Sequence, residues 1–378
     1  MPPSDLATAA QQGVVVTCAN PGTRYASEHE RITQLAYARR LAALKGYADR
    51  GPYDPSARYP GHVYFVPAGT LRAQEAAALG IRGPQDLFGG VVPHGFVATK
   101  AITHPLLEPD AAALPGWNTA FHGQLGDAVL AGYSAFSLDD ALRAGMRLLA
   151  GGPVRIKQVR ASGGLGQWVA RDAAELKRRL EAVDPAEVLS HGIVLEENLD
   201  QVRTFSVGQV QVGAMTASYF GSQRLTRNNH GDEVYGGSDL TVSRGDFGAL
   251  LALQIEPQIR HAIEQARRYD AAVKGCFSGF FASRINYDVL VGRDESGRDR
   301  SGVLEQSWRV GGATGPELAA LDAFRNQPGC ERICATGFEI FGECPEPPPD
   351  AVVYFRGEDP RVGRLTKYTL VEPHVDAR

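Results

Sequence analysis

Two acidic residues stand inside neighbouring apolar segments in the last third of the chain, Asp288 within residues 284–288 and Glu305 within residues 304–309. If the two segments are strands that pair as an antiparallel hairpin, both carboxylates point into one cleft. Facing carboxylates repel each other unless a cation lies between them, and Mg²⁺ binds such oxygen atoms together with phosphate oxygens. The alternative is two solvated surface acids, which the apolar residues around them disfavour. The pair therefore indicates a fold with a cation-binding cleft at a strand pair.

A glycine-rich loop, Ser-Gly-Gly-Leu-Gly at residues 162–166, lies between two predicted strands at 154–159 and 167–170. Backbone N–H groups in such a loop can bind a phosphate, and Lys157 just before it adds a point charge. The segment is neither a P-loop nor a dinucleotide fingerprint, because it joins two strands and no Gly-Lys-Ser/Thr sequence opens a helix. Taken alone, it is equally compatible with a tight turn that binds nothing.

The composition excludes several classes of protein. The 378 residues are 22% charged with a net charge of −4, so a general nucleic-acid binder with a basic surface is not expected. No apolar stretch approaches the ~20 residues that span a bilayer, and the N-terminus lacks a signal-peptide pattern. Five scattered cysteines fit a reducing compartment, and no histidine completes a zinc spacing beside Cys330, Cys334 and Cys344. We therefore expect a cytoplasmic protein with ordinary thiols and no nucleic-acid or membrane partner.

The N-terminal block has the element order of an open α/β layer. Strands are predicted at residues 13–17, 62–66 and 90–92, and helices at 27–44 and 71–79. Ser27 and Glu30 form a capping-box pair at the start of the first helix. This block is predicted to end near residue 98.

The central part mixes helices with antiparallel strands. Ser137 with Asp140 and Asp172 with Glu175 are predicted to cap two helices. Further strands are predicted at residues 193–199, 279–291 and 303–308, and two long antiparallel strands within residues 202–220. Helices are predicted at 247–272, interrupted at Pro257, and at 317–325. The polar, glycine-rich residues 224–243 predict a long loop. Residues 351–355 and 365–371 predict a terminal hairpin.

The order of these parts resembles the ATP-grasp superfamily, which includes D-alanine–D-alanine ligase, biotin carboxylase and purine-biosynthesis ligases. Lys157 before a glycine loop, the acidic pair Glu196-Glu197 and the later pair Asp288 and Glu305 carry the resemblance, which covers roughly residues 91–325. It implies an α/β protein that is α+β in its central part, with an N-terminal open α/β domain followed by an ATP-grasp fold. The chain is also similar to a bacterial family within this superfamily, and that likeness supplies no substrate. The expected domains are residues 1–98, 99–195, 196–328 and 329–378.

The resemblance implies a role for each matching position. Lys100 and Lys157 correspond to the two lysines that bind the phosphates of ATP, and Arg309 to the arginine that steadies the transferred phosphate. Lys157 and Arg309 are therefore the expected catalytic residues. The remaining ATP contacts are expected from the loop residues Ser162, Gly163, Gly164 and Gly166 and from the hinge residues Glu196, Glu197 and Leu199. The implied Mg²⁺ ligands are Asp288, Glu305 and Ser307.

Two positions depart from the family pattern. Residue 307 is serine where the family usually has asparagine, and a hydroxyl binds Mg²⁺ less firmly than an amide carbonyl does. Thr204 stands where a ribose-binding glutamate is expected, so that contact is lost or moves to Asp200. Each departure weakens the expectation of strong catalysis, although the primary acids and lysines remain.

The loop at residues 224–244 is expected to face the acceptor substrate and to supply Arg227. It resembles the stretch before a Gly-Asp-Ser sequence in carbamoyl-phosphate synthetase and its relatives, which this chain has in the form Gly237-Ser238-Asp239. The alternative is an ordinary polar surface loop. Arg284 is expected either to bind a substrate carboxylate or to pair with Glu305. Gly311 and Gly312 are the other expected substrate contacts.

The implied reaction is Mg²⁺-dependent ligation. ATP would phosphorylate a small carboxylate to an acyl phosphate, which an amine or another nucleophile would then attack. Phosphoryl transfer depends mainly on positioning and charge stabilisation, which a site of lysines, Mg²⁺ and arginine supplies. The alternatives are an ATP-binding protein with a regulatory or scaffold role, and a kinase-like phosphotransferase. The expected partners are ATP and the two small substrates, with a homodimer possible.

Overall fold

The structure, a computed structural model, describes residues 13–19, 27–160, 166–343 and 345–373. The predicted phosphate-loop residues Ser162, Gly163 and Gly164, and also Cys344, lie outside the described residues. In the part of the chain that is described, no helix combines the length and apolar character needed to cross a membrane.

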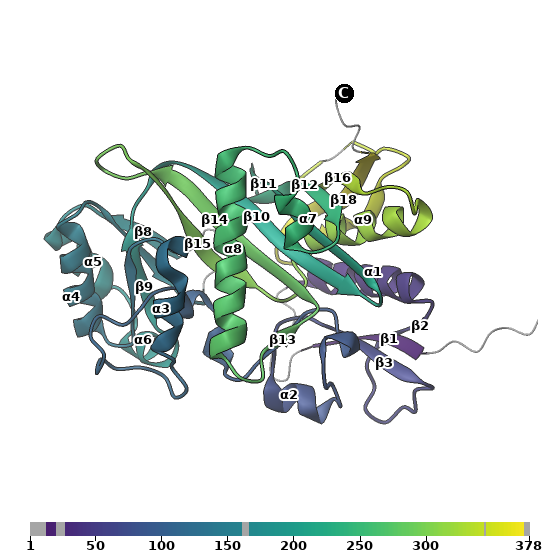
Figure 1. The fold of residues 1–378 in the computed structure, drawn as a ribbon, viewed down its shortest axis with the longest axis horizontal. Helices are drawn as coiled ribbons and strands as arrows, with labels where there is room; N and C mark the ends of the chain where they lie inside the picture. Colours follow the sequence, from purple (N-terminus) through teal and green to yellow (C-terminus); the bar gives the residue numbers. More distant parts are fainter. Residues whose placement is uncertain (1–12, 20–26, 161–165, 344, 374–378) are drawn as a thin grey trace, which may run out of the picture.

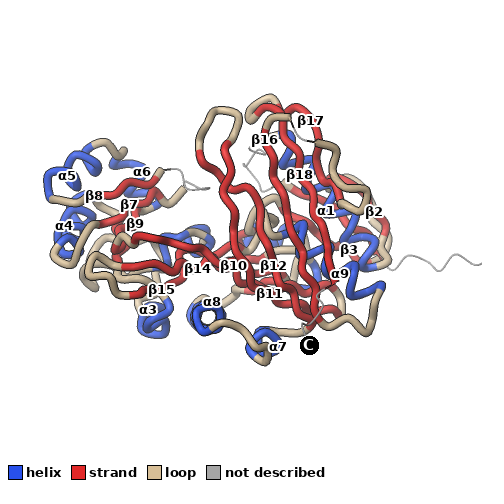
Figure 2. The backbone as a smooth tube through the Cα atoms, turned by 90° about the horizontal axis from the view of Figure 1, so that it is seen from above, coloured by secondary structure: helices blue, strands red, loops and turns tan. Residues whose placement is uncertain are grey.

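One large antiparallel sheet organises the molecule (Figure 2). Its strand order is β15-β14-β10-β11-β12-β16-β18-β17. The strands are β10 (Asp200–Val212), β11 (Met215–Arg227), β12 (Glu233–Arg244), β14 (Arg284–Arg293), β15 (Asp299–Ser307), β16 (Arg332–Phe341), β17 (Val352–Asp359) and β18 (Gly363–Pro373). The predicted terminal hairpin is confirmed as β17 and β18, and the unpredicted β16 joins it to the large sheet.

Helices cover both faces of this sheet because its strands alternate between two apolar surfaces. The long helix α8 (Pro257–Cys276) crosses one face, and its Ile263 and Ala266 share a core with Val207. In Figure 1 it stands in front of β10, β14 and β15. Helices α1 (Glu28–Lys45) and α9 (Thr314–Asn326) pack on the other face, against Val210 among others. The predicted break at Pro257 is confirmed, with α7 (Phe247–Leu251) before it.

A small four-stranded sheet forms a separate layer beside the large one, at the left of Figure 1. Its antiparallel order is β6-β9-β7-β8, from β6 (Gly132–Ala135), β7 (Val154–Gln158), β8 (Gln167–Ala170) and β9 (Ile193–Glu197). Its helices are α4 (Leu138–Leu149), α5 (Ala173–Glu181) and α6 (Pro185–His191). Helix α3 (Ala120–Leu125) packs instead against α8. The predicted caps are confirmed, since Ser137 accepts a hydrogen bond from the Asp140 amide and Asp172 accepts one from the Glu175 amide.

The N-terminal strands form two small sheets rather than one continuous layer. Strands β1 (Gly13–Cys18), β2 (Ala48–Pro52) and β3 (His62–Pro67) are parallel in the order β2-β1-β3, and Ser27 caps α1 as predicted. Strand β5 (Gly90–Val92) pairs instead with β4 (Leu71–Arg72) and with β13 (Phe281–Ala282), and α2 (Ala73–Ala78) follows β4. The third predicted strand thus joins a partner almost 200 residues away, a pairing that no local pattern encodes.

The prediction of a long loop at residues 224–243 is wrong. Strands β11 and β12 continue through this segment, and Arg227 pairs directly with Glu233. Only residues 228–232 connect them. Backbone hydrogen bonds between two long strands hold the hairpin together whatever its side chains are, so a polar and glycine-rich composition is tolerated here.

Candidate active site

The small sheet contributes a buried cluster of three charged or polar side chains. Lys157 on β7 forms an ion pair with Oε1 of Glu196 on β9, and Oε2 of Glu196 lies 3.0 Å from His104 Nε2. The exposed fractions of these residues are 4%, 2% and 1%. Burial by itself raises the pKa of Glu196, but Lys157 and His104 outweigh it and hold that pKa at about 2. The Glu196 carboxylate is therefore ionised and lies against the Lys157 ammonium group inside the protein.

The predicted hinge residues connect the small sheet to the large one. Oε1 of Glu197 accepts hydrogen bonds from the Ala131 amide at 3.1 Å and from Arg300 Nη2 at 2.9 Å. Leu199 is 3% exposed and packs against Leu290 of β14. Glu197 thus links β9 to an arginine of β15, while Leu199 supplies an apolar surface between the two sheets.

The two predicted metal-binding acids lie directly opposite each other. Strands β14 and β15 pair in antiparallel fashion, as predicted, and their register aligns Asp288 with Glu305 and Asn286 with Ser307. The register shifts after Asp288, so the hairpin carries an irregularity beside the acid pair. Lys100, only 7% exposed, forms an ion pair with Glu305 at 3.1 Å.

Neighbouring amides hold the carboxylate of Asp288 in place. Its Oδ1 accepts hydrogen bonds from Gln223 Nε2 at 2.8 Å, from Asn286 Nδ2 at 3.0 Å and from Ser206 Oγ at 3.4 Å. Desolvation and the nearby Glu305 charge raise the pKa of Asp288 to about 6. Ionisation of Asp288 is costly because the group is buried beside a second carboxylate. A cation bound nearby would stabilise its ionised form.

A buried polar network that the sequence did not predict adjoins this acid pair. Glu317 of α9 is fully buried and accepts from Arg284 Nη2 at 2.8 Å and from Arg284 Nε at 3.1 Å. The hydroxyl of Tyr219 lies 2.5 Å from Glu317 Oε1 and 2.9 Å from Asn286 Oδ1. The chain of contacts continues through Asn286 to Asp288.

This network corrects the expectation for Arg284. The arginine is 1% exposed, and its Nη1 also donates to the backbone oxygens of Ser307 at 3.1 Å and of Arg309 at 2.7 Å. Its carboxylate partner is Glu317 rather than Glu305. Arg284 thus fixes the backbone of the segment after β15.

The other predicted site residues lie at the ends of the strands. Arg309 is exposed and donates to the Val310 carbonyl at 2.9 Å, and the Gly311 amide donates to Thr314 Oγ1 at 3.0 Å. Thr204 lies on β10 opposite Leu290. Arg227 is exposed at the end of β11, where it donates to the Gly231 carbonyl. Gly166 follows the part of the phosphate loop that is not described.

The donor set fits Mg²⁺ bound together with a nucleotide. Among the described residues, no group of three or more His, Cys, Asp and Glu side chains could hold a metal ion. Mg²⁺ in phosphate-transfer sites is commonly bound by one or two carboxylates, with phosphates and water completing its shell. Asp288 and Glu305 supply two carboxylates, so the protein's share of such a shell is present.

The comparison of the sequence with known protein families assigns the chain to one of them. A family model described as "Protein of unknown function (DUF3182)" matches residues 16–369. The chain belongs to this family. A search of curated protein sequences finds no match.

The solved structures that are similar to this chain include a carboxylase domain, a ligase and a synthase. The biotin carboxylase domain of 2-oxoglutarate carboxylase from Hydrogenobacter thermophilus is 13% identical, with 96% of this chain and 87% of that chain covered and a TM-score of 0.55. Phosphoribosylamine–glycine ligase from Thermotoga maritima is 15% identical, with 96% of this chain and 92% of that chain covered and a TM-score of 0.51. Carboxyaminoimidazole ribonucleotide synthase from Aspergillus clavatus is 12% identical, with 96% of this chain and 94% of that chain covered and a TM-score of 0.50. The family member described here therefore has the ATP-grasp fold.

Proposed function

We propose that this chain is an Mg²⁺- and ATP-dependent ligase that activates a small carboxylate and joins it to an amine or another nucleophile. The observation that carries the proposal is the alignment of Asp288 with Glu305, beside Lys100, in a fold shared with ligases. Two of the similar structures are complexes, one with MgADP and one with ATP.

The small and large sheets would hold opposite ends of the nucleotide. Leu199 and Leu290 offer an apolar surface for the base, and Lys157 and Lys100 offer positive charge for the phosphates. Because each lysine is already paired with a carboxylate, a phosphate would bind the ammonium group alongside that carboxylate, since displacing the buried Glu196 would leave its charge without Lys157.

The acid pair would hold the metal that supplies charge neutralisation to the phosphates. Asp288 and Glu305 would bind it, with Ser307 next to them, and the amides of Gln223 and Asn286 keep Asp288 oriented. Arg309, at the end of β15, would steady the transferred phosphate. Such a site accelerates phosphoryl transfer by positioning and electrostatics rather than by a side-chain nucleophile.

A second candidate is an ATP-binding protein with weak or absent turnover. Two observations favour it: Ser307 Oγ lies 3.3 Å from Arg284 Nη1, which competes with a metal for the hydroxyl oxygen, and Thr204 replaces an expected ribose contact. The two candidates predict the same ATP binding and differ in product release.

The test is to incubate the purified protein with Mg-ATP and pools of amino acids and small carboxylic acids, and to measure ADP. A ligase should release ADP only with certain pools, and Glu305→Gln should lower that rate roughly 100-fold, as loss of one charge-stabilising group does. Glu295→Gln, at an exposed turn position, serves as the matched control. Tight ATP binding with no ADP from any pool would favour the second candidate.

A further inference from the structure

Gln306 lies on β15 between Glu305 and Ser307, the two residues of this strand that are proposed to bind the metal. Because side chains alternate along a strand, Gln306 points to the opposite face of the sheet from these two. There its Oε1 accepts a hydrogen bond from the hydroxyl of Tyr269 on α8 at 3.1 Å, and the residue is only 6% exposed. The polar side chain is therefore enclosed between the large sheet and α8, where each unpaired polar atom would be costly.

The amide nitrogen of Gln306 holds the segment that carries Lys100. Its Nε2 donates to the carbonyl oxygens of Val97 and Thr99, each at 2.8 Å. The two carbonyl oxygens need donors and the Tyr269 hydroxyl can donate, so these three partners fix the orientation of the amide. Gln306 thus ties β15 to the backbone immediately before Lys100.

The same segment is held on the other side of Lys100. The short helix η3 (Lys100–Thr103) ends at Thr103, which is fully buried, and Thr103 Oγ1 donates to the Leu304 carbonyl oxygen at 3.3 Å. Leu304 and Gln306 are the two neighbours of Glu305 in the sequence. Strand β15 therefore holds η3 through the two positions that flank its acidic residue.

This anchoring places the charge of Lys100 beside Glu305. The ammonium group of Lys100 lies 3.1 Å from Oε2 of Glu305, and the lysine is 7% exposed. A lysine charge sits at the end of a flexible four-carbon chain, so its location depends on where the backbone is held. A shift of η3 away from β15 would move the charge away from the acid pair.

We propose that Gln306 is a positioning residue for the proposed reaction. Its amide holds η3 against β15 and so places the Lys100 charge where it meets the phosphates of ATP beside Glu305. This role rests on the proposed function, in which Lys100 contacts ATP. Gln306 acts only through Lys100, because its own side chain lies on the α8 face of the sheet.

The experiment measures the affinity of the full-length protein for ATP with Mg²⁺ by titration calorimetry, and the urea midpoint of each variant. Gln306→Met keeps a side chain of similar length but removes both amide donors, so η3 loses its anchor. We expect the ATP affinity to fall at least roughly tenfold. In a protein that already carries Lys100→Met, the same substitution should change the ATP affinity by less than about twofold, because no lysine charge remains to be positioned.

A smaller change tests the anchor on the other side of Lys100. Thr103→Val keeps the branched shape of the side chain and removes the hydroxyl that donates to the Leu304 carbonyl oxygen. We expect the ATP affinity to fall roughly threefold, and the loss should again disappear when Lys100→Met is present. This variant gives the same test if Gln306→Met does not fold.

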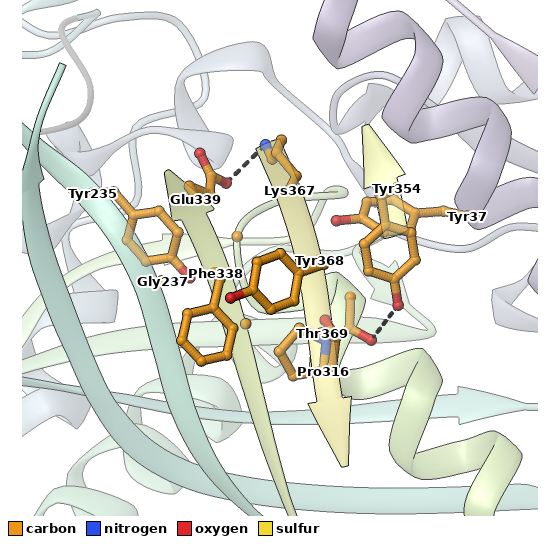
Figure 3. A pocket seen from close by; sticks show the side chains of 13 residues that line it. Tyr37, Tyr235, Gly237, Pro316, Phe338, Glu339, Tyr354, Lys367, Tyr368 and Thr369 are labelled. Carbon is orange, nitrogen blue, oxygen red and sulfur yellow. Dashed lines mark hydrogen bonds and ion pairs between the residues drawn. The ribbon is translucent and has the colours of Figure 1, made fainter. Parts of the chain in front are cut away.

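Two control variants separate positioning from stability. Gln34 of α1 is also a buried amide, and it donates to the Val66 carbonyl oxygen at 2.7 Å in the N-terminal part of the fold, so Gln34→Met should lower the urea midpoint and leave ATP affinity unchanged. Lys367→Met is the matched control for Lys100→Met, because Lys367 forms an ion pair with Glu339 at 2.7 Å on the last strands of the large sheet (Figure 3). The free space beside this second pair is about 10 Å³, room for about one water molecule, so Lys367→Met should not change ATP affinity.

The results distinguish this role from the proposed function. If Gln306→Met binds ATP as tightly as the native protein, or loses as much affinity with Lys100→Met present as without it, the positioning role is overturned even where ADP is released. If the loss depends on Lys100 but no pool of carboxylic acids yields ADP, the positioning role stands and the ligase proposal fails. If the native protein binds no ATP, both are overturned.

Discussion

Lys157 and Glu196 form a buried ion pair between neighbouring strands of the small sheet, and His104 binds the other oxygen of the same carboxylate. Under the proposed function the pair would couple folding to nucleotide binding, because the lysine that would contact phosphate also neutralises a carboxylate that is 2% exposed. Removing either partner leaves a buried charge, which is far more costly than removing both.

Lys157→Met should therefore affect stability and binding together. We expect the free energy of unfolding to fall by about 3–5 kcal/mol, the usual cost of breaking a buried pair. Lys157→Met with Glu196→Leu should recover most of that stability but not the affinity for ATP. Urea denaturation and ATP titration of the two variants test this, and a double variant as unstable as the single one contradicts it.

The pH dependence of stability should reflect Glu196. Its pKa is about 2 in the folded protein and 4.5 ordinarily, so its contribution is complete above pH 4.5 and is lost as the pH falls from about 4.5 to about 2. Over that range native stability should fall more steeply than in the doubly substituted protein. Urea midpoints measured at several pH values, compared between the two proteins, check the difference.

Asp288 should show the opposite behaviour. Its pKa is about 6 when folded against 3.8 ordinarily, so its ionisation costs stability increasingly as the pH rises from about 3.8 to about 6, and the cost persists above. Asp288→Asn should therefore be at least as stable as the native protein at pH 7, with a smaller advantage at pH 5. Thermal unfolding at both pH values tests this. A variant clearly less stable at pH 7 argues against it.

The assignment of Arg284 as a structural residue is also testable. Glu317→Gln leaves the guanidinium without its carboxylate in a fully buried setting, so we expect a loss of about 3–5 kcal/mol in the free energy of unfolding. Glu331→Gln, at an exposed acid near Arg244, is the control and should change stability by no more than about 1 kcal/mol. A stable Glu317→Gln protein that has lost only its affinity for substrate would restore the substrate role.

Local patterns predicted those parts of the fold that short-range physics determines. Ser137 and Asp172 cap their helices because their side chains can reach an amide three residues later. The hairpin of Asp288 and Glu305 was predictable because two apolar strands lie close together in sequence and pair with their neighbours. The resemblance to a known family supplied the expectation that Lys157 and Glu196 both contact ATP, but not that they pair with each other.

Partners distant in sequence could not be predicted in this way. In the sequence, Glu317 is an ordinary acidic residue of a short predicted helix. Its burial against Arg284 and Tyr219 results from the packing of α9 on the sheet, which the local sequence does not encode. The alternation of Arg284, Asn286 and Asp288 on one face of β14 was the available signal that polar partners would be needed there. Similarly, His104 lies in a segment without regular periodicity, so its contact with Glu196 had no local signature.

The role of the acid pair and the two lysines in binding ATP is tested most directly by titrating ATP into the native protein and into Asp288→Asn, each with Mg²⁺ and with a chelator. We predict that Mg²⁺ strengthens ATP binding to the native protein at least roughly tenfold, which corresponds to about 1.4 kcal/mol. The variant should lose most of that Mg²⁺ dependence. Equal ATP affinity with and without Mg²⁺ in the native protein, or no ATP binding at all, would contradict the account.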